Sequence, residues 1–202
     1  TTKRNIFWFR RDLRLSDNPA LVAALENCDE LIAVFILDEK LINQSGSKRL
    51  AYLGNSLRAL DESLGNKLHV MVGDQVEVLK SLVERYGASE VHISQEFEPY
   101  GAARDLRVES AGINLVRTGS PYAVAPGRVL KPSDATPYRV YTPFYKAWCV
   151  HGWRKPAAKP AKINLVTPDA GDRNFVDWKV PEGCEIPMAG ETAALARWEV
   201  FK

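Results

Sequence analysis

The sequence has few cysteines and no arrangement of them that indicates a metal or disulfide site. Cys28, Cys149 and Cys184 lie far apart, without a CxxC pair or a histidine at metal-ligand spacing. Isolated cysteines in odd number favour free, buried thiols in a reducing compartment. The N-terminus also lacks the apolar core of a signal peptide. We therefore expect a cytoplasmic protein without a bound metal.

Long apolar runs and a strong net charge are missing too. No apolar stretch approaches the roughly 20 residues needed to cross a bilayer, so no membrane partner is expected. The 27 basic and 25 acidic residues give a formal net charge of +2, which provides no global field to attract nucleic acid. With 46% hydrophobic and 26% charged residues, the chain can bury a substantial core, as globular proteins do.

Three common catalytic or nucleotide-binding motifs are absent. The sequence has no GxGxxG after its first apolar run, no GxxxxGK[ST] and no GxSxG. These absences disfavour an ordinary dinucleotide fold, a P-loop and a hydrolase with a nucleophile elbow. His69, His92 and His151 occur singly. We expect them to be core or surface residues, and we expect no catalytic residue in this chain.

Five short apolar runs are present, separated by longer amphipathic stretches. The runs are typical of strands buried on both faces, and they cover residues 5–9, 30–37, 67–72, 90–94 and 113–116. The stretches between them have helical periodicity and cover residues 19–26, 48–64, 75–87 and 100–112. Alternating strands and helices predict a doubly wound α/β fold: a parallel five-stranded sheet with helices on both faces, similar to a Rossmann fold.

Charged residues follow three of the expected strands. Arg10 and Arg11 follow the first, Asp38 follows the second, and Glu96 and Glu98 follow the fourth. In a doubly wound fold the ligand lies beyond the carboxyl ends of the strands. These loops would surround one crevice with apolar walls, suited to an aromatic and partly polar ligand. A structural ion-pair network and a solvated loop are the alternative interpretations of the same charges.

The last third of the chain has a different texture. Residues 137–153 interleave aromatic and basic side chains, which fits a packed helix or stacking on single-stranded nucleic acid, and we favour the packed helix. Lys, Pro and Ala are then dense, as in an extended linker. A new helix opens near the end of the sequence. We divide the chain into an α/β domain at 1–130, an aromatic helical segment completing it at 131–152, a linker at 153–189, and the start of a truncated helical domain at 190–202.

Four separated segments together resemble the DNA photolyase/cryptochrome family. They are FWFRRDLRLSDNPAL (7–21), SQEFEPYGAARD (94–105), YRVYTPFYKAW (138–148) and GETAALARW (190–198). The resemblance implies the N-terminal light-harvesting domain of a deoxyribodipyrimidine photolyase. Its antenna pigment would pass excitation to FAD in a following helical domain that binds UV-damaged DNA and splits cyclobutane pyrimidine dimers. This chain alone would then be inactive in repair.

Two other functions fit the same segments. One is the corresponding domain of a cryptochrome photoreceptor, and the other is a free-standing flavin- or nucleotide-binding module. The final residues favour a longer protein over the free-standing module, because GETAALARWEVFK reads as the opening of a further domain. We expect that protein to be a monomer.

The resemblance also assigns a pigment pocket. Its positions correspond here to Arg10, Arg11, Phe35, Leu37, Asp38, Arg49, Leu53, Glu96 and Glu98. Folate-binding members carry an Asn-Glu pair where this sequence has Tyr100 and Gly101. The resemblance therefore favours 8-hydroxy-5-deazaflavin or FMN as the antenna over methenyltetrahydrofolate.

Overall fold

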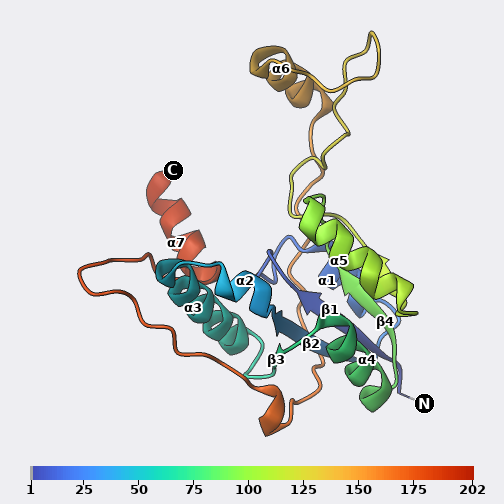
Figure 1. Cartoon of the computed structure of the whole chain (residues 1–202). Coiled ribbons are helices and arrows are strands. Elements are labelled where there is room, and N and C mark those ends of the chain that lie inside the picture. The colour runs from blue at the N-terminus through green and yellow to red at the C-terminus, as the bar shows by residue number, and fades with distance from the viewer. Residues whose placement is uncertain (1) are drawn as a thin grey trace.

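The computed structural model describes residues 2–202 and contains one five-stranded sheet whose strands all run parallel (Figure 1). The strands are β1 (Arg4–Phe9), β2 (Glu30–Leu37), β3 (His69–Val72), β4 (Ala88–Ile93) and β5 (Leu115–Arg117). Their order is β3-β2-β1-β4-β5, so the winding reverses at β1. This order confirms the predicted doubly wound α/β fold, and each strand overlaps one of the five apolar runs.

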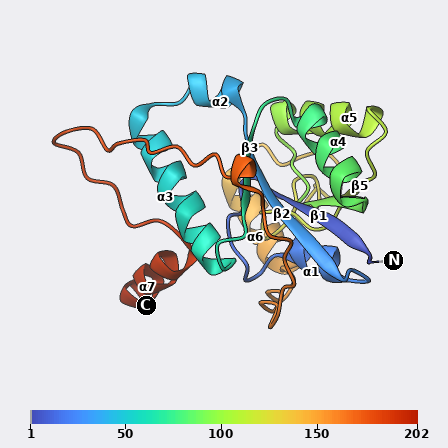
Figure 2. The same cartoon turned by 90° about the horizontal axis from the view of Figure 1, so that it is seen from below.

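Helices connect the strands and cover both faces of the sheet (Figure 2). On one face lie α1 (Pro19–Leu25) and α3 (Ser47–Ser63), and on the other lie α4 (Gln75–Tyr86) and α5 (Pro99–Ser110). All four agree with the predicted helical stretches. The short helix α2 (Glu39–Asn43), directly after β2, was not predicted. Among residues 2–202, no helix combines the length and apolarity that crossing a bilayer requires.

The two faces of the sheet have separate apolar cores. Successive side chains of a strand point to opposite faces, so Phe7 and Phe9 pack on the face of α1 and α3, where Leu57 is buried. Ile6 and Trp8 pack on the face of α4 and α5. This double burial is why the strands read as continuous apolar runs rather than as alternating ones.

Leucines repeat at steps of three and four residues along helix α3 and so form a stripe on one of its faces. Leu57, Leu60 and Leu64 are buried in the core. Leu53, one turn before Leu57, and Leu50, two turns before it, are only half-buried. The amino-terminal half of α3 therefore extends past the core toward the carboxyl edge of the sheet. At that edge its apolar face can line a cavity instead of contacting strands.

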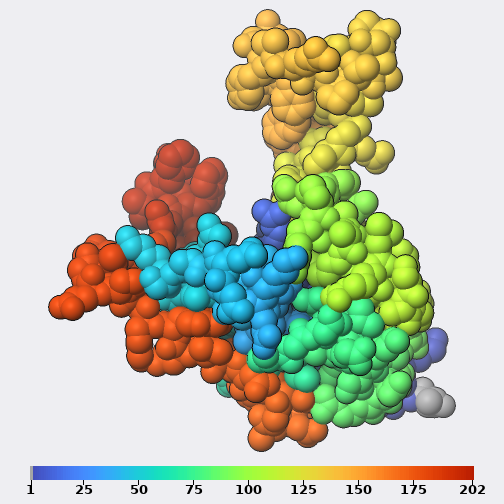
Figure 3. All heavy atoms as spheres, in the orientation of Figure 1, coloured from blue at the N-terminus to red at the C-terminus, as the bar shows by residue number. Residues whose placement is uncertain are grey.

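The aromatic segment forms a helix, α6 (Tyr141–His151), but does not complete the α/β domain as expected. None of its residues is buried, and in Figure 3 it stands apart from the rest of the molecule. Its rings stack on one another instead: the centroids of Tyr141 and Tyr145 lie 5.7 Å apart, and those of Trp148 and Trp153 lie 4.8 Å apart. The aromatic side chains of α6 therefore do not pack on the sheet domain.

The linker is extended, as predicted, and it also pairs with the sheet. The amide of Leu31 in β2 donates to the carbonyl of Asn164 (2.8 Å), and the amide of Val166 donates to the carbonyl of Leu31 (3.0 Å). After a single 3-10 turn (Ala170–Asp172), the amide of Asn174 donates to the carbonyl of Val70 in β3 (2.9 Å). Residues 164–174 thus cover the outer edge of the sheet. The chain ends in helix α7 (Glu191–Phe201).

The three cysteines are free, as expected, but they are not buried. Cys149 on α6 is exposed, and Cys28 and Cys184 are half-buried. Their positions explain the difference, because all three lie outside the sheet and outside the helices that cover it.

Candidate binding site at the carboxyl edge of the sheet

The loops that leave β1, β2 and β4 meet at one edge of the sheet, next to the point where the winding reverses. They enclose a cavity of about 290 Å³. Six of the nine predicted site residues line it: Arg10, Arg11, Phe35, Asp38, Glu96 and Glu98. Trp8, Leu41, Tyr100 and Arg104 complete much of the remaining wall.

A second cavity of about 890 Å³ adjoins the first and shares Arg10 and Arg11 with it. It lies between the loop after β1, the amino-terminal half of α3 and the start of α7. The predicted residues Arg49 and Leu53 line this cavity, together with Leu50. Eight of the nine predicted positions are therefore divided between two neighbouring cavities.

Leu37 lines neither cavity, contrary to the expectation. Its side chain is 1% exposed and belongs to the core on the face of α1 and α3. Leu37 ends β2 and points to the same face as Phe35, but it is covered completely there, whereas Phe35 reaches the cavity wall. The role of Leu37 is structural.

Four charged side chains form a buried cluster beside the first cavity. Arg10 Nη1 lies 2.6 Å from Asp105 Oδ1, and Arg10 Nε lies 3.3 Å from Glu96 Oε1. Arg104 Nη2 contacts the same two carboxylates at 3.0 Å and 3.3 Å. All four side chains are at most 10% exposed. Two cations and two anions neutralise each other, which offsets the cost of burying them.

Trp8 supports this cluster from β1. The guanidinium carbons of Arg10 and Arg104 lie 5.1 Å and 4.8 Å from the centroid of its ring, within range of cation–π attraction. Burial, and then the neighbouring Arg104, lowers the pKa of Arg10, while Asp105 and Glu96 oppose this change. Because an arginine side chain keeps its proton in proteins, Arg10 stays cationic within the cluster. Arg10 and Glu96 are therefore engaged by the protein itself.

Arg11 and Arg49 differ from Arg10 in having no such partners. Both side chains are exposed, and within residues 2–202 neither forms a hydrogen bond or an ion pair. Arg11 lines both cavities and Arg49 lines the larger one. A planar guanidinium with free donors suits a phosphate or a carboxylate. These two arginines are the cations that the site can offer to an anionic ligand.

Asp38 and Tyr100 close the opposite side of the first cavity. The Tyr100 hydroxyl donates to Asp38 Oδ2, and Asp38 Oδ1 accepts from the amide of Lys40 (3.0 Å), which caps α2. Burial and the bond to Asp38 raise the pKa of Tyr100, so its hydroxyl stays a donor at neutral pH. Asp38 thus has a capping role in addition to lining the cavity.

The sequence did not lead us to assign eight of the fourteen residues that line the first cavity, among them Trp8, Leu41, Tyr100 and Arg104. Trp8 and Leu41 were not singled out, because Trp8 lies within an apolar strand and Leu41 lies on the unpredicted helix α2. Tyr100 and Arg104 are four residues apart on α5 and so share one face of that helix. That spacing, next to Glu96, is the signal in the sequence that could have revealed both of them.

Comparison with known proteins gives matches along the whole chain. Residues 5–162 match the family model of DNA photolyase. A deoxyribodipyrimidine photo-lyase from a Synechococcus strain is 34% identical over 97% of the chain, which covers 44% of that relative. The crystal structure of a class III photolyase from Agrobacterium tumefaciens superposes on the whole chain with a TM-score of 0.83 at 29% identity.

An archaeal photolyase from Sulfolobus tokodaii, solved with two FAD molecules, matches 81% of the chain with a TM-score of 0.67 at 28% identity. The chain spans 44%, 45% and 38% of the lengths of these three proteins, less than half in each case. The family model alone matches well over half of the 202 residues. The chain therefore belongs to the DNA photolyase family.

Proposed function

We propose that this chain is the light-harvesting domain of a deoxyribodipyrimidine photolyase. The observation that carries the proposal is the pair of adjoining cavities at the carboxyl edge of the sheet, which have apolar walls and two arginines without partners among residues 2–202. Known ligand pockets measure roughly 300–1,000 Å³ and are lined mostly by apolar groups with a few polar ones. The larger cavity, at about 890 Å³, falls in this range, and the smaller one, at about 290 Å³, lies just below it.

The residues of the site fit a flavin-type antenna, either 8-hydroxy-5-deazaflavin or FMN. Phe35, Leu41 and Leu53 provide apolar surface for a flat ring system. Arg11 and Arg49 provide positive charge for an anionic side chain. When bound, such a pigment would absorb light and pass the excitation energy to FAD. The protein's own task is to hold the ring, pair its charge and exclude water.

Methenyltetrahydrofolate fits less well. At the positions where folate-binding members carry Asn and Glu, the Tyr100 hydroxyl is bonded to Asp38, and Gly101 has no side chain. A Cβ at residue 101 would collide with the carboxylate of Glu96. A polar side chain there would therefore disturb the ion pairs of Arg10 and Arg104 with Glu96. The Sulfolobus photolyase with its two FAD molecules supports a flavin as the second pigment.

The remaining parts of the proposal concern the longer protein. There, FAD and UV-damaged DNA would be bound by a helical domain after α7, and the reaction would be the light-driven splitting of cyclobutane pyrimidine dimers. The 202-residue chain by itself would not repair DNA. A monomer located in the cytoplasm remains our prediction.

Pigment binding is tested by titrating the purified chain with FMN, deazaflavin and methenyltetrahydrofolate while following ligand fluorescence. We expect FMN or deazaflavin to bind, and Arg11→Ala to weaken binding by 10- to 100-fold, since a hydrogen bond to a charged group contributes about 1.5–3 kcal/mol. Arg139→Ala is the control, because Arg139 is exposed and lines neither cavity. Saturable folate binding without any response to the flavins would overturn the assignment.

Repair is tested on the full reading frame. Under near-ultraviolet and blue light, the longer protein should remove thymine dimers from DNA, and the 202-residue chain should not. A longer protein that binds FAD but leaves dimers intact would favour the cryptochrome alternative.

A further inference from the structure

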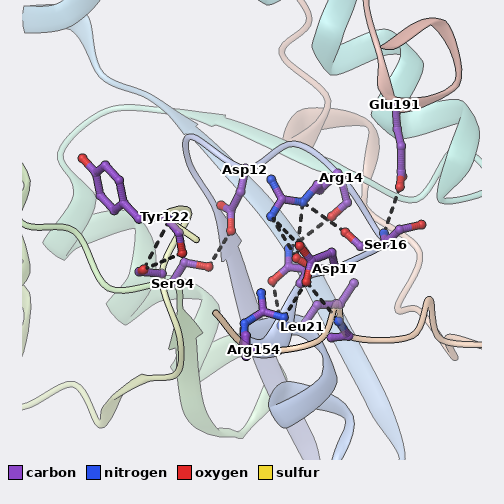
Figure 4. A network of polar contacts seen from close by, with 12 residues as sticks. Asp12, Arg14, Ser16, Asp17, Leu21, Ser94, Tyr122, Arg154 and Glu191 are labelled. Carbon is purple, nitrogen blue, oxygen red and sulfur yellow. Dashed lines mark hydrogen bonds and ion pairs between the residues drawn. The ribbon is translucent and has the colours of Figure 1, made fainter. Parts of the chain in front are cut away.

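The loop between β1 and α1 holds the beginning of the linker (Figure 4). The amide of Asp17 donates to the carbonyl of Ala157 (3.0 Å), and Asp17 Oδ1 accepts from the amide of Ala157 (3.0 Å). Arg154 Nη1 adds an ion pair to the same carboxylate oxygen, at 2.5 Å. Three contacts thus converge on one residue of the loop.

The same loop holds the end of the linker. Glu191, the first residue of α7, accepts from the amides of Leu15 (2.9 Å) and Ser16 (3.0 Å), one with each carboxylate oxygen. Two charge-assisted bonds in parallel fix orientation as well as distance. Figure 4 shows Glu191 reaching Ser16 from the side opposite Arg154. Both ends of the 153–190 segment are therefore fastened within three consecutive residues, 15–17.

The loop is built to serve as a rigid support. Arg14 donates to the carbonyls of Ser16 (3.1 Å) and Asp17 (2.9 Å), and Asn18 Nδ2 donates to the carbonyl of Arg14 (3.1 Å). Asn18 in turn caps α1 through the amide of Leu21 (3.1 Å). The backbone of Asp17 is left-handed, with φ of 48°, a conformation that Asp adopts more readily than most residues.

The first residue of α7 is bonded to the loop after β1, whereas the later residues of the helix are largely exposed. Gly190 lies so close to α3 that a Cβ on it would meet Ala59 Cβ at 2.6 Å. Farther along α7, Leu195, Trp198 and Phe201 are at least 52% exposed. Only the first turn therefore determines where this helix points. The larger cavity lies between the two anchored parts, because Asp17 and Glu191 both line it.

We propose that Asp17 and Glu191 are positioning residues that fasten the linker to the loop after β1 and so set the place of α7 relative to the two cavities. The proposal rests on the proposed function, in which α7 leads to the flavin domain. Transfer of excitation energy depends on the separation and orientation of donor and acceptor. The loop after β1 lines the pigment site. Fastening the start of α7 to this loop would therefore control both the separation and the orientation of the two pigments.

We call the contacts that Asp17 and Glu191 make between the loop and the linker the clamp. Breaking the Glu191 contacts should allow α7 to move over a distance that can be estimated. The side chain of Trp178 packs on the core next to Gly54, so about a dozen residues separate that contact from α7. A flexible segment of this length spans about 5–6 Å times the square root of its residue number, or about 20 Å. Without the Glu191 contacts, the position of α7 should spread over a distance of this order.

The test uses the pigment-free chain with its three native cysteines replaced by alanine. Spin labels are attached at Lys80→Cys on α4 and Arg197→Cys on α7, two exposed positions outside the clamp. The distance distribution between them is then measured by pulsed electron paramagnetic resonance. Glu191→Gln and Asp17→Asn should broaden it toward about 20 Å. Glu199→Gln is the matched control on the same helix, since Lys202 is the only polar partner of the Glu199 side chain within residues 2–202.

Amide hydrogen exchange distinguishes positioning from a general loss of stability. In Glu191→Gln, exchange at Leu15 and Ser16 should accelerate, while amides of β1, β2 and β4 keep the parent rate. An unchanged distance distribution in both clamp variants, or faster exchange throughout the sheet, would overturn the proposal. Because neither measurement requires a pigment, failure here is separate from a failure to bind flavin.

Discussion

At the scale of single residues, adjacent arginines at the sheet edge have different tasks. Arg10 is buried among carboxylates, and Arg11 is exposed without a partner in the described chain. The sequence RRD predicts that arginines follow β1 but does not show which one turns inward. That choice depends on Glu96, Arg104 and Asp105, which lie far away in the sequence. The structural ion-pair network that was one interpretation of the charges after the strands therefore exists, and Arg10 rather than Arg11 belongs to it.

Arg10→Ala should destabilise the protein strongly. Removing one member of a buried ion-pair cluster leaves Glu96 and Asp105 without full compensation, and such losses cost about 3–5 kcal/mol. Arg11→Ala should change the free energy of unfolding by less than about 0.5 kcal/mol, as surface substitutions usually do. Urea unfolding followed by circular dichroism measures both. Equal effects of the two substitutions would contradict the division of roles.

At the scale of elements, the sequence predicted those that depend on local pattern. The five apolar runs and the stripe of Leu57, Leu60 and Leu64 identify strands and helices, because burial on both faces or on one stripe leaves a periodic trace. Helix α2 has only five residues and none of them is buried, so it leaves no such trace. Helix α6 does not pack on the sheet domain, because its aromatic residues indicate burial without identifying the surface that covers them.

The stripe on α3 should show a gradient of stability along the helix. Leu57→Ala removes a side chain that is 1% exposed and should cost about 2–5 kcal/mol through lost burial and a residual cavity. Leu53→Ala should cost less, because Leu53 is half-buried and already borders a cavity. Leu53→Ala should instead weaken flavin binding. Chemical denaturation and flavin titration of both variants test the gradient, which a larger stability loss for Leu53→Ala would refute.

The clamp on α7 should open in acid. Burial tends to raise the pKa of Glu191, but the hydrogen bonds from Ser16 and Leu15, aided by Lys159, lower it overall. Asp17 behaves in the same way, with bonds from Ala157 and Arg154 and the charge of Arg14 outweighing burial. A carboxyl whose pKa is lower in the folded state stabilises it above the unfolded value, about 4. That contribution is lost as the pH falls through the folded pKa.

As the pH falls below about 4, we therefore expect the amide signals of Leu15, Ser16 and Ala157 to change together in nuclear magnetic resonance spectra, before the sheet unfolds. In Glu191→Gln, the change at Leu15 and Ser16 should disappear and the change at Ala157 should remain. Titration of all three amides only at the global unfolding transition would show that the clamp has no separate equilibrium.

At the scale of the whole molecule, topology located the site. A doubly wound sheet brings the carboxyl ends of β1 and β4 together where the winding reverses, so the segments after these strands meet regardless of their distance in sequence. The division into two cavities could not be predicted, because it depends on where α3 and α7 begin relative to the loop after β1. Side-chain patterns do not encode such distances between elements.

The exposed helix α6 provides a test of the longer protein as a whole. Isolated helices shorter than about 12–15 residues are marginal in water, and α6 has 11 residues, none of them buried. In the 202-residue chain, its amides should therefore exchange within about tenfold of the rate of an unfolded chain.

In the full reading frame, the stacked rings of Tyr141, Tyr145 and Trp148 should be covered, because exposed apolar patches of this kind mark interaction surfaces. Exchange in α6 should then slow by at least about 100-fold, which corresponds to roughly 2.7 kcal/mol of added local stability. Amides of α4, which is already packed on the sheet, are the internal control and should not change. Equally fast exchange of α6 in both proteins would show that the rest of the chain leaves this helix uncovered.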